Sequence, residues 1–168
     1  MRYHGIAIWL LLSVFCCSLA CSSNTNQNKN AAVPVPATSP APVGPPLVQA
    51  AQTKSADEVR AMIDAGANVN DQTESGVTPL MLAAGMGRVE VVQVLIDRGA
   101  EVNHKTPGNF TPLMSACLTG QTAVVKLLIS KGADVKVKDA GQQTAMKYAQ
   151  SKGHAEIVAL LKKAGAKE

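Results

Sequence analysis

Between residues 76 and 103 the apolar residues fall into two short helical patterns separated by glycine. The first pattern is TPLMLAA (78–84), in which Thr78 can cap a helix and proline takes the first helical position. The second is VEVVQVLI (89–96), whose apolar residues recur at helical spacing. Gly87 and Gly99 follow the two patterns, and glycine readily adopts the left-handed conformation that ends a helix. The stretch therefore predicts two short helices joined by a tight turn.

The same pattern recurs every 33 residues along the chain. The segments DAGANVN, DRGAEVN, SKGADVK and KAGAKE come into register on Gly66, Gly99, Gly132 and Gly165. Upstream, TPLMLAA aligns with TPLMSAC and TAMKYAQ, and PPLVQAA (45–51) falls in the same register. A helix pair this short cannot bury both of its faces. A fixed period of this length therefore predicts a solenoid, in which each unit packs on its neighbours.

These segments resemble the ankyrin-repeat family, whose unit reads roughly G-x-TPLHxAAxxGHxxVVxxLLxxGAxVN. The resemblance implies an all-α solenoid of four helix-turn-helix units with hairpin loops, which we place at 47–70, 71–103, 104–136 and 137–168. The first unit has Lys54-Ser55 where Gly-His is usual. Its outer residues, and those of the last unit, are more polar than those between, as the terminal caps of a solenoid require.

One position departs from the family pattern. The histidine of TPLH is replaced by Met81, Met114 and Lys147 in three successive units. The hydrogen bonds that this histidine makes between loop and helix in the family must therefore be absent or replaced. Packing by the two methionine side chains is the simplest substitute.

The first 46 residues have a different pattern. Residues 6–20 form an apolar run, IAIWLLLSVFCCSLA, that is shorter than the roughly 20 residues needed to span a bilayer as a helix. A short head containing Arg2 and the small residues at the end of the run predict a secretory signal peptide over 1–20. Residues 21–46 are rich first in Ser and Asn and then in Pro, which predicts a disordered, extended tether. A Pro-rich docking ligand is the alternative, but no basic residues flank it.

Cys21 directly follows the predicted signal peptide. Leu19-Ala20-Cys21 resembles a bacterial lipobox, in which the cysteine is lipidated, although Ser18 stands where leucine is usual. With the polar tether after it, this favours a membrane-anchored lipoprotein of the bacterial cell envelope that faces the periplasm. Ordinary cleavage after Ala20 would instead give a soluble periplasmic or secreted protein. An uncleaved apolar run would remain as an anchor.

Composition narrows the remaining chemistry. Cys117 is the one cysteine beyond Cys21, so we expect no structural disulfide and an inert packing role for its thiol, with a reactive thiol as the alternative. A net charge of +4 and an aromatic content of 3% do not indicate nucleic-acid binding. From residue 121 onward nine lysines stand against four acidic residues. This excess is either a solvated surface or a patch for phosphate or anionic lipid.

The sequence shows no pattern of catalytic or metal-binding residues. His4 lies in the predicted signal, His104 in a loop and His154 at the structural Gly-His position of the family, so no two share a helix face. Gly85-Met86-Gly87 ends a helix rather than opening one, which is the wrong polarity for a phosphate loop. We therefore expect no enzyme activity, no cofactor and no metal.

Ankyrin-repeat proteins are overwhelmingly protein-binding scaffolds, so the resemblance implies a protein partner for a monomeric domain. In the family the contacts come from the hairpin tips and from the exposed face of the first helices. The matching residues here are Glu74, Val77, Met86, Lys105, Asn109, Phe110, Leu118 and Thr119.

Four of these residues are apolar, namely Val77, Met86, Phe110 and Leu118. Positions 33 apart stack on one another, so the four could form one exposed stripe for a partner. Phe110 could instead pack down onto its own hairpin. The leading functional hypothesis is an adaptor or stabilising partner of another exported protein. The alternatives are an inhibitor or immunity protein of a periplasmic enzyme or toxin, and an envelope spacer.

Overall fold

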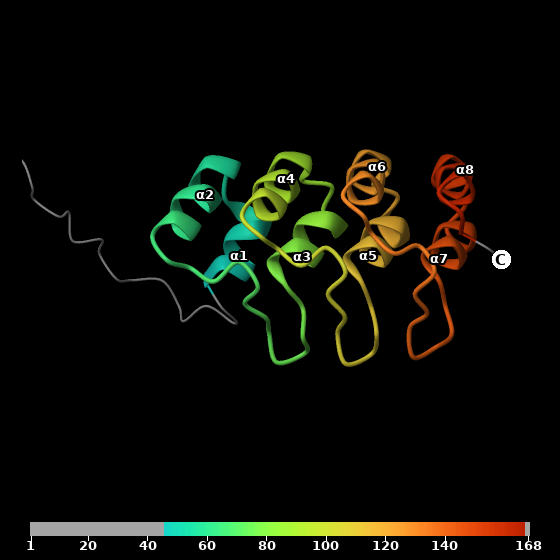
Figure 1. The fold of residues 1–168 in the computed structure, drawn as a ribbon, viewed down its shortest axis with the longest axis horizontal. Coiled ribbons are helices and arrows are strands. Elements are labelled where there is room, and N and C mark those ends of the chain that lie inside the picture. Colours follow the sequence, from blue (N-terminus) through green and yellow to red (C-terminus); the bar gives the residue numbers. More distant parts are fainter. Residues whose placement is uncertain (1–45, 167–168) are drawn as a thin grey trace, which may run out of the picture. The chain divides into compact units, whose positions relative to one another are not determined.

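The structure is a computed structural model of the 168-residue chain, and it describes residues 46–166. Within these residues it contains eight helices and no strand, arranged as four pairs (Figure 1). The predicted all-α solenoid is confirmed. The predicted signal peptide, Cys21 and the tether up to residue 45 lie outside the described residues. The pairs are α1 (Pro46–Thr53) with α2 (Ala56–Asp64), α3 (Pro79–Gly85) with α4 (Val89–Asp97), α5 (Pro112–Thr119) with α6 (Thr122–Ser130), and α7 (Ala145–Ser151) with α8 (Ala155–Lys163).

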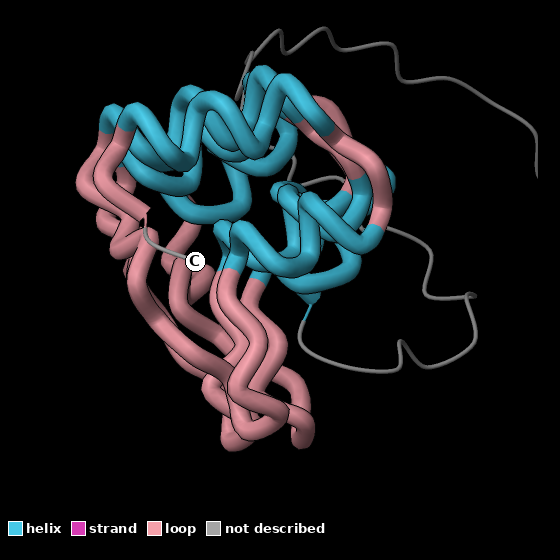
Figure 2. The backbone as a smooth tube through the Cα atoms, turned by 90° about the vertical axis from the view of Figure 1, so that its right-hand side faces the viewer, coloured by secondary structure: helices cyan, strands magenta, loops and turns pink. Residues whose placement is uncertain are grey.

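The helices of residues 46–166 form two layers. The first helices of the pairs pack on one another in the order α1, α3, α5, α7, and we call these the inner helices. The second helices, α2, α4, α6 and α8, pack in the same order and are called the outer helices. Between each outer helix and the next inner helix the chain forms a hairpin, and the hairpins project side by side away from the helices (Figures 1 and 2). None of these helices is long and apolar enough to cross a membrane.

Threonine hydroxyls cap the N-termini of three of the inner helices. Thr78, Thr111 and Thr144 each accept a hydrogen bond from the backbone N–H three residues on, at 3.3, 3.3 and 3.2 Å. The two prolines of TPLM follow at the first helical position, as the sequence predicted. All three threonines are buried, so each side chain both satisfies an otherwise unpaired N–H and fills the core.

The core runs through all four units between the two helix layers. Leu95 and Val92 of α4 are completely buried, as are Ala83 and Ala116 on the inner helices. Small alanines allow the backbones of neighbouring inner helices to approach closely. Cys117 takes the place of Ala84 one unit later and is also completely buried. The Cys117 side chain packs in the core, as the sequence predicted, and burial raises the pKa of its thiol to about 12.

Two asparagines tie successive units together. The side-chain amide of Asn70 donates to the Gly99 carbonyl at 3.2 Å, and its oxygen accepts from the Glu101 N–H at 2.9 Å. Asn103 repeats both bonds one unit later, to Gly132 and Asp134, at 3.0 and 2.8 Å. The equivalent residue of the third unit is Lys136, which cannot make this pair of bonds.

Ion pairs between the outer helices follow the same period. Asp64 pairs with Arg98, and Asp97 pairs with Lys131 at 3.3 Å. At the next step Ser130 and Ala164 occupy the two positions, and a different pair, Lys126 with Glu156 at 2.8 Å, joins α6 to α8. The asparagine bonds and the ion pairs are all exposed, so each contributes little by itself, and both repeat from unit to unit.

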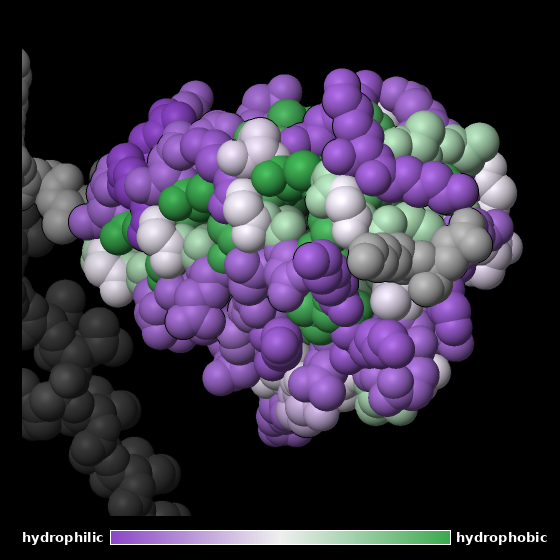
Figure 3. Space-filling model, turned by 45° about the vertical axis from the view of Figure 1, so that its right-hand side comes forward, coloured by the Kyte–Doolittle hydropathy of each residue, from purple (hydrophilic) through white to green (hydrophobic). Residues whose placement is uncertain are grey.

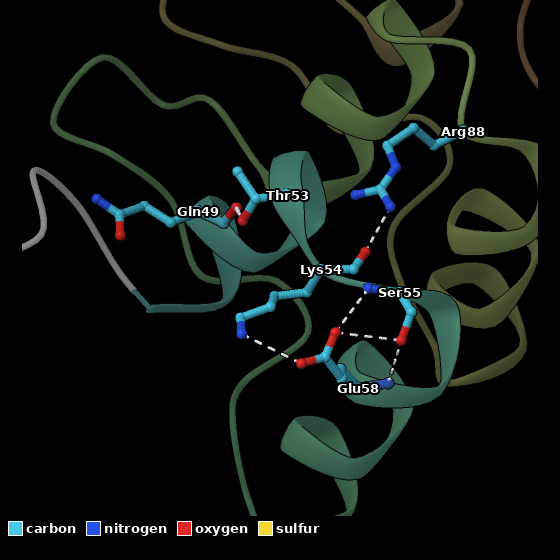
Figure 4. A network of polar contacts seen from close by, with 6 residues as sticks. All are labelled: Gln49, Thr53, Lys54, Ser55, Glu58 and Arg88. Atoms are coloured by element: carbon cyan, nitrogen blue, oxygen red, sulfur yellow. Dashed lines mark hydrogen bonds and ion pairs between the residues drawn. The ribbon is translucent and has the colours of Figure 1, made fainter. Parts of the chain in front are cut away.

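The first unit begins its outer helix in another way. Ser55 and Glu58 form a capping box, in which the Glu58 N–H donates to Ser55 Oγ at 3.2 Å and the Ser55 N–H donates to Glu58 Oε2 at 3.0 Å (Figure 4).

Arg88 of the second unit donates to the carbonyls of Ala51 and Lys54 at the end of α1, at 3.0 and 2.5 Å. A cation stabilises this end of a helix, so Arg88 both caps α1 and joins two units.

The turn between inner and outer helix is packed against the following unit. Gly87 and Gly120 have φ values of +75° and +79°, and the side chains of Gln121 and His154 lie directly over them. A Cβ at Gly120 would stand 2.7 Å from the His154 ring. Gly153 has the same conformation, with φ +75°, but nothing lies within 4 Å of its Cβ position.

This difference gives a matched pair of substitutions. Gly153→Ala should lower the free energy of unfolding by about 1 kcal/mol, because alanine is strained at positive φ. Gly120→Ala should cost clearly more, since the His154 ring must also move. Urea unfolding of both variants measures the difference. Equal losses would mean that the contact between His154 and the glycine turn contributes nothing to the stacking of the units.

Candidate protein-binding surface

The hairpins of three units are built on the same turn. In each, an oxygen of a Thr or Asp side chain accepts the backbone N–H of the residue four positions later. The pairs are Val77 to Thr73 at 3.1 Å, Phe110 to Thr106 at 3.1 Å and Gln143 to Asp139 at 2.8 Å. The turn is therefore fixed by local bonds, and the residues at its tip are held in place without a partner.

The left-handed residue of each turn differs between hairpins. It is Gly76 in the second unit, with φ +76°, and Asn109 in the third, with φ +59°. A Cβ at Gly76 would stand 2.7 Å from Pro107 of the next hairpin, so glycine is required there for space as well as for conformation. Asn109 is exposed, and asparagine tolerates this backbone region better than other side chains.

The structure divides the predicted contact residues into two groups. Glu74, Met86, Lys105, Asn109 and Thr119 are exposed, whereas Val77, Phe110 and Leu118 are half-buried. Met86, with 53% of its surface exposed, is the one large apolar side chain exposed within residues 46–166. A continuous exposed apolar stripe is therefore absent from the described part of the chain. The surface combines one apolar side chain with polar and charged ones.

Phe110 is half-buried because it reaches the next unit. Its ring meets Tyr148 of α7 edge to face, with centroids 5.6 Å apart and planes at 81°. This contact is neither of the two arrangements considered from the sequence, which were partner contact and packing on its own hairpin. The sequence signal for it is weak, because Tyr148 stands where the two preceding units have Leu82 and Ser115.

Tyr148 also anchors the last hairpin. Its hydroxyl donates to the carboxylate of Asp139 at 2.5 Å, and Asp139 is buried. This hydrogen bond holds the pKa of Asp139 below its ordinary value and raises the pKa of Tyr148 to about 12. Phe110, Tyr148 and Asp139 together join the hairpin of the third unit, helix α7 and the hairpin of the fourth unit.

The Tyr148–Asp139 bond predicts a pH-dependent contribution to stability. A lowered pKa in the folded state means that the carboxylate stabilises the fold at pH values above the ordinary Asp pKa of about 3.9, and that this contribution is lost as the pH falls through the folded pKa. Tyr148→Phe should therefore destabilise the protein by about 1–2 kcal/mol near pH 6, and this loss should shrink as the pH falls through the folded pKa of Asp139. Thermal melting of both proteins across this range checks the prediction. A pH-independent difference would assign the effect of Tyr148 to ring packing alone.

The outer helices carry a groove, and no metal-binding cluster is seen in the part of the chain that the structure describes. No three His, Cys, Asp or Glu side chains within residues 46–166 are placed to hold a metal ion. A groove of about 540 Å³ lies on the outer helices, but Asp57, Arg60 and Asp97 along it already form ion pairs with each other or with Lys131. The side of the molecule in Figure 3 is mainly polar, with a narrow row of apolar patches and no broad apolar area.

The comparisons with known proteins agree with this architecture. The family model described as ankyrin repeats (3 copies) matches residues 13–106 and 105–168. The search of curated proteins gives no match. The matched residues cover most of the chain and include all eight helices of residues 46–166. The chain therefore belongs to the ankyrin-repeat family.

Proposed function

We propose that the repeats bind another exported protein in the bacterial cell envelope, as its adaptor or stabilising partner. Ankyrin repeats indicate a protein–protein interaction module, and the family is typically a non-catalytic binding scaffold. The observation that carries the proposal is a row of exposed side chains on successive hairpins and inner helices. They are Glu74, Met86, Lys105, Asn109 and Thr119.

Rigidity supports this assignment. The hairpins of the second and third units are fixed by their own turn bonds, and inner helices α3 and α5 are fixed by threonine caps and by packing on both neighbours. A surface that is already ordered loses little conformational entropy when a partner binds. The exposed side chains of the row therefore need no rearrangement of the backbone to make contacts.

The envelope location rests on residues 1–45, through the signal-like run, Cys21 and the tether. If Cys21 is lipidated, the protein should be labelled by an alkyne fatty-acid probe in bacteria and should sediment with membranes. Cys21→Ala should lose both the label and the membrane association. A wild-type protein that is soluble and unlabelled would mean ordinary secretion, and the binding proposal would then apply to a soluble protein.

The binding proposal is tested by capture. Tagged full-length protein, expressed in bacteria and crosslinked in intact cells, should recover a discrete exported protein in a one-to-one complex, identified by mass spectrometry. Loss of a recovered enzyme's activity on binding would indicate an inhibitor or immunity protein. Sedimentation with cell-wall material and no discrete partner would indicate an envelope spacer and contradict the proposal.

A further inference from the structure

Charge is distributed very unevenly along the stack. Residues 46–103 carry four basic and eight acidic side chains, a net charge of −4 with His neutral. Residues 104–166 carry nine basic and three acidic side chains, a net charge of +6. The small overall charge of the protein hides this difference between its two halves.

Each of the three acidic side chains in residues 104–166 already has a hydrogen-bond or ion-pair partner. Glu156 pairs with Lys126, the buried Asp139 accepts from Tyr148, and Asp134 accepts the backbone N–H of Lys136 at 2.8 Å. Lys126 on α6 and Lys131, the residue that follows α6, both form ion pairs. The positive charge that remains is therefore concentrated on the other lysines.

Five exposed lysines lie on the hairpin segments and inner helix of the third and fourth units. None of their ammonium groups has a hydrogen-bond or ion-pair partner within the described residues. We call them the hairpin-side lysines, and they are Lys105, Lys136, Lys138, Lys147 and Lys152.

Their positions bring several of them together. Lys105 and Lys138 are 33 residues apart, at equivalent places in adjacent hairpins. Lys138 forms a backbone bridge with Thr144, and the Thr144 hydroxyl accepts a hydrogen bond from the backbone N–H of Lys147 at 3.2 Å. Lys136 lies in the turn at residues 135–136, two residues before Lys138. Like charges gathered in this way repel one another, so an anionic ligand would stabilise them.

We infer that this surface binds an acidic segment of the partner protein, an inference that rests on the function proposed above. In Figure 2 each hairpin projects at an angle to the inner helix that follows it, so that the hairpins and the inner helices are the two arms of a concave corner. Lysines lie on both arms, with Lys105 and Lys138 on the hairpins and Lys152 at the end of α7. A narrow polypeptide can reach both arms, whereas a flat bilayer cannot. The exposed apolar Met86 on the adjacent unit suits a mixed acidic and apolar peptide.

The test uses purified full-length protein and a fluorescein-labelled decaglutamate peptide, with a Gly-Ser peptide of equal length as the control. Binding measured by fluorescence anisotropy should be specific to decaglutamate and should weaken at least about tenfold between 50 and 500 mM salt, because salt screens exposed charges. Carbodiimide crosslinks from the peptide should fall on the hairpin-side lysines rather than on Lys131 or Lys163.

Two matched variants locate the site. Lys138→Glu with Lys147→Glu should weaken decaglutamate binding by about tenfold or more. Lys162→Glu with Lys163→Glu changes the net charge equally but on the outer helix α8, and should leave binding within about twofold. Circular dichroism confirms that both remain folded. Equal losses in the two variants, or no binding by the wild type, would overturn the inference.

Other polyanions serve as competing outcomes. Tighter binding to vesicles containing phosphatidylglycerol, or to oligodeoxythymidylate, than to decaglutamate would assign the lysines to a membrane or to nucleic acid and reject the inference.

The capture experiment distinguishes this inference from the proposed function. A captured partner that the Lys138→Glu, Lys147→Glu variant retains would leave the proposed function standing and remove this inference. Failure to capture any partner would count against the proposed function itself.

Discussion

Leu95→Ala is expected to lower the free energy of unfolding by about 2–5 kcal/mol. Leu95 lies on α4, is completely buried and belongs to the core that runs through the units. Alanine would leave a cavity that helices fixed by two neighbouring units cannot fill. Equilibrium unfolding in urea, with the slope checked for a change in cooperativity, measures the loss.

Thr111→Ala serves as the comparison for Leu95→Ala. It removes a helix cap and, because Thr111 is buried, a smaller volume of the core than Leu95→Ala does, and it should cost about 1 kcal/mol. Both positions lie in the interior of the solenoid, so both report on the same cooperative unit. Equal losses for the two variants would show that the assignment of core and cap is wrong.

Met114→Lys is expected to have the second large effect, a loss of about 3 kcal/mol or more. Met114 occupies the position of the TPLH histidine and is 1% exposed, so a lysine there would place an unpaired ammonium group in the core. The fourth unit has a lysine, Lys147, at the equivalent position, where the side chain is exposed. The same residue type is therefore tolerated in the last unit and excluded from the third.

The reverse substitution completes the test of this position. Lys147→Met should change stability by no more than about 0.5 kcal/mol, because it alters an exposed side chain. Melting of both variants at one pH gives the comparison. From the burial of Met81 and Met114 we conclude that methionine packing replaces the family histidine. Melting of Met114→Lys at the wild-type temperature would contradict this conclusion.

Much of the fold could be predicted from residue types whose effects are local. Thr78 and Thr111 are helix caps, the prolines after them fit the first turn, and Gly87 and Gly99 have the positive φ that ends a helix. Repetition at 33 residues then placed each pair beside the next. The Ser55–Glu58 capping box also has a local signature, Ser-x-x-Glu, and could have been found from the sequence.

Contacts between units were harder to predict, because they depend on side chains that are far apart in the sequence. Phe110 of the third unit meets Tyr148 of the fourth, and Arg88 of the second unit reaches the end of α1 in the first. Neither contact follows from spacing alone, since the equivalent residues in other units differ. The half-buried state of Leu118 had the same cause, because the degree of exposure depends on how closely neighbouring helices pack.

The central claim is that a protein partner contacts the hairpins and inner helices. Site-specific photo-crosslinking in intact bacteria tests it most directly, with p-benzoylphenylalanine placed at Met86 and Thr119 on the inner side and at Glu90 and Ala123 on the outer helices. All four positions are exposed, so the probe should not disturb the core. We expect one crosslinked protein from Met86 and Thr119 and none from Glu90 and Ala123. Crosslinks to a protein from the outer positions alone would contradict the account.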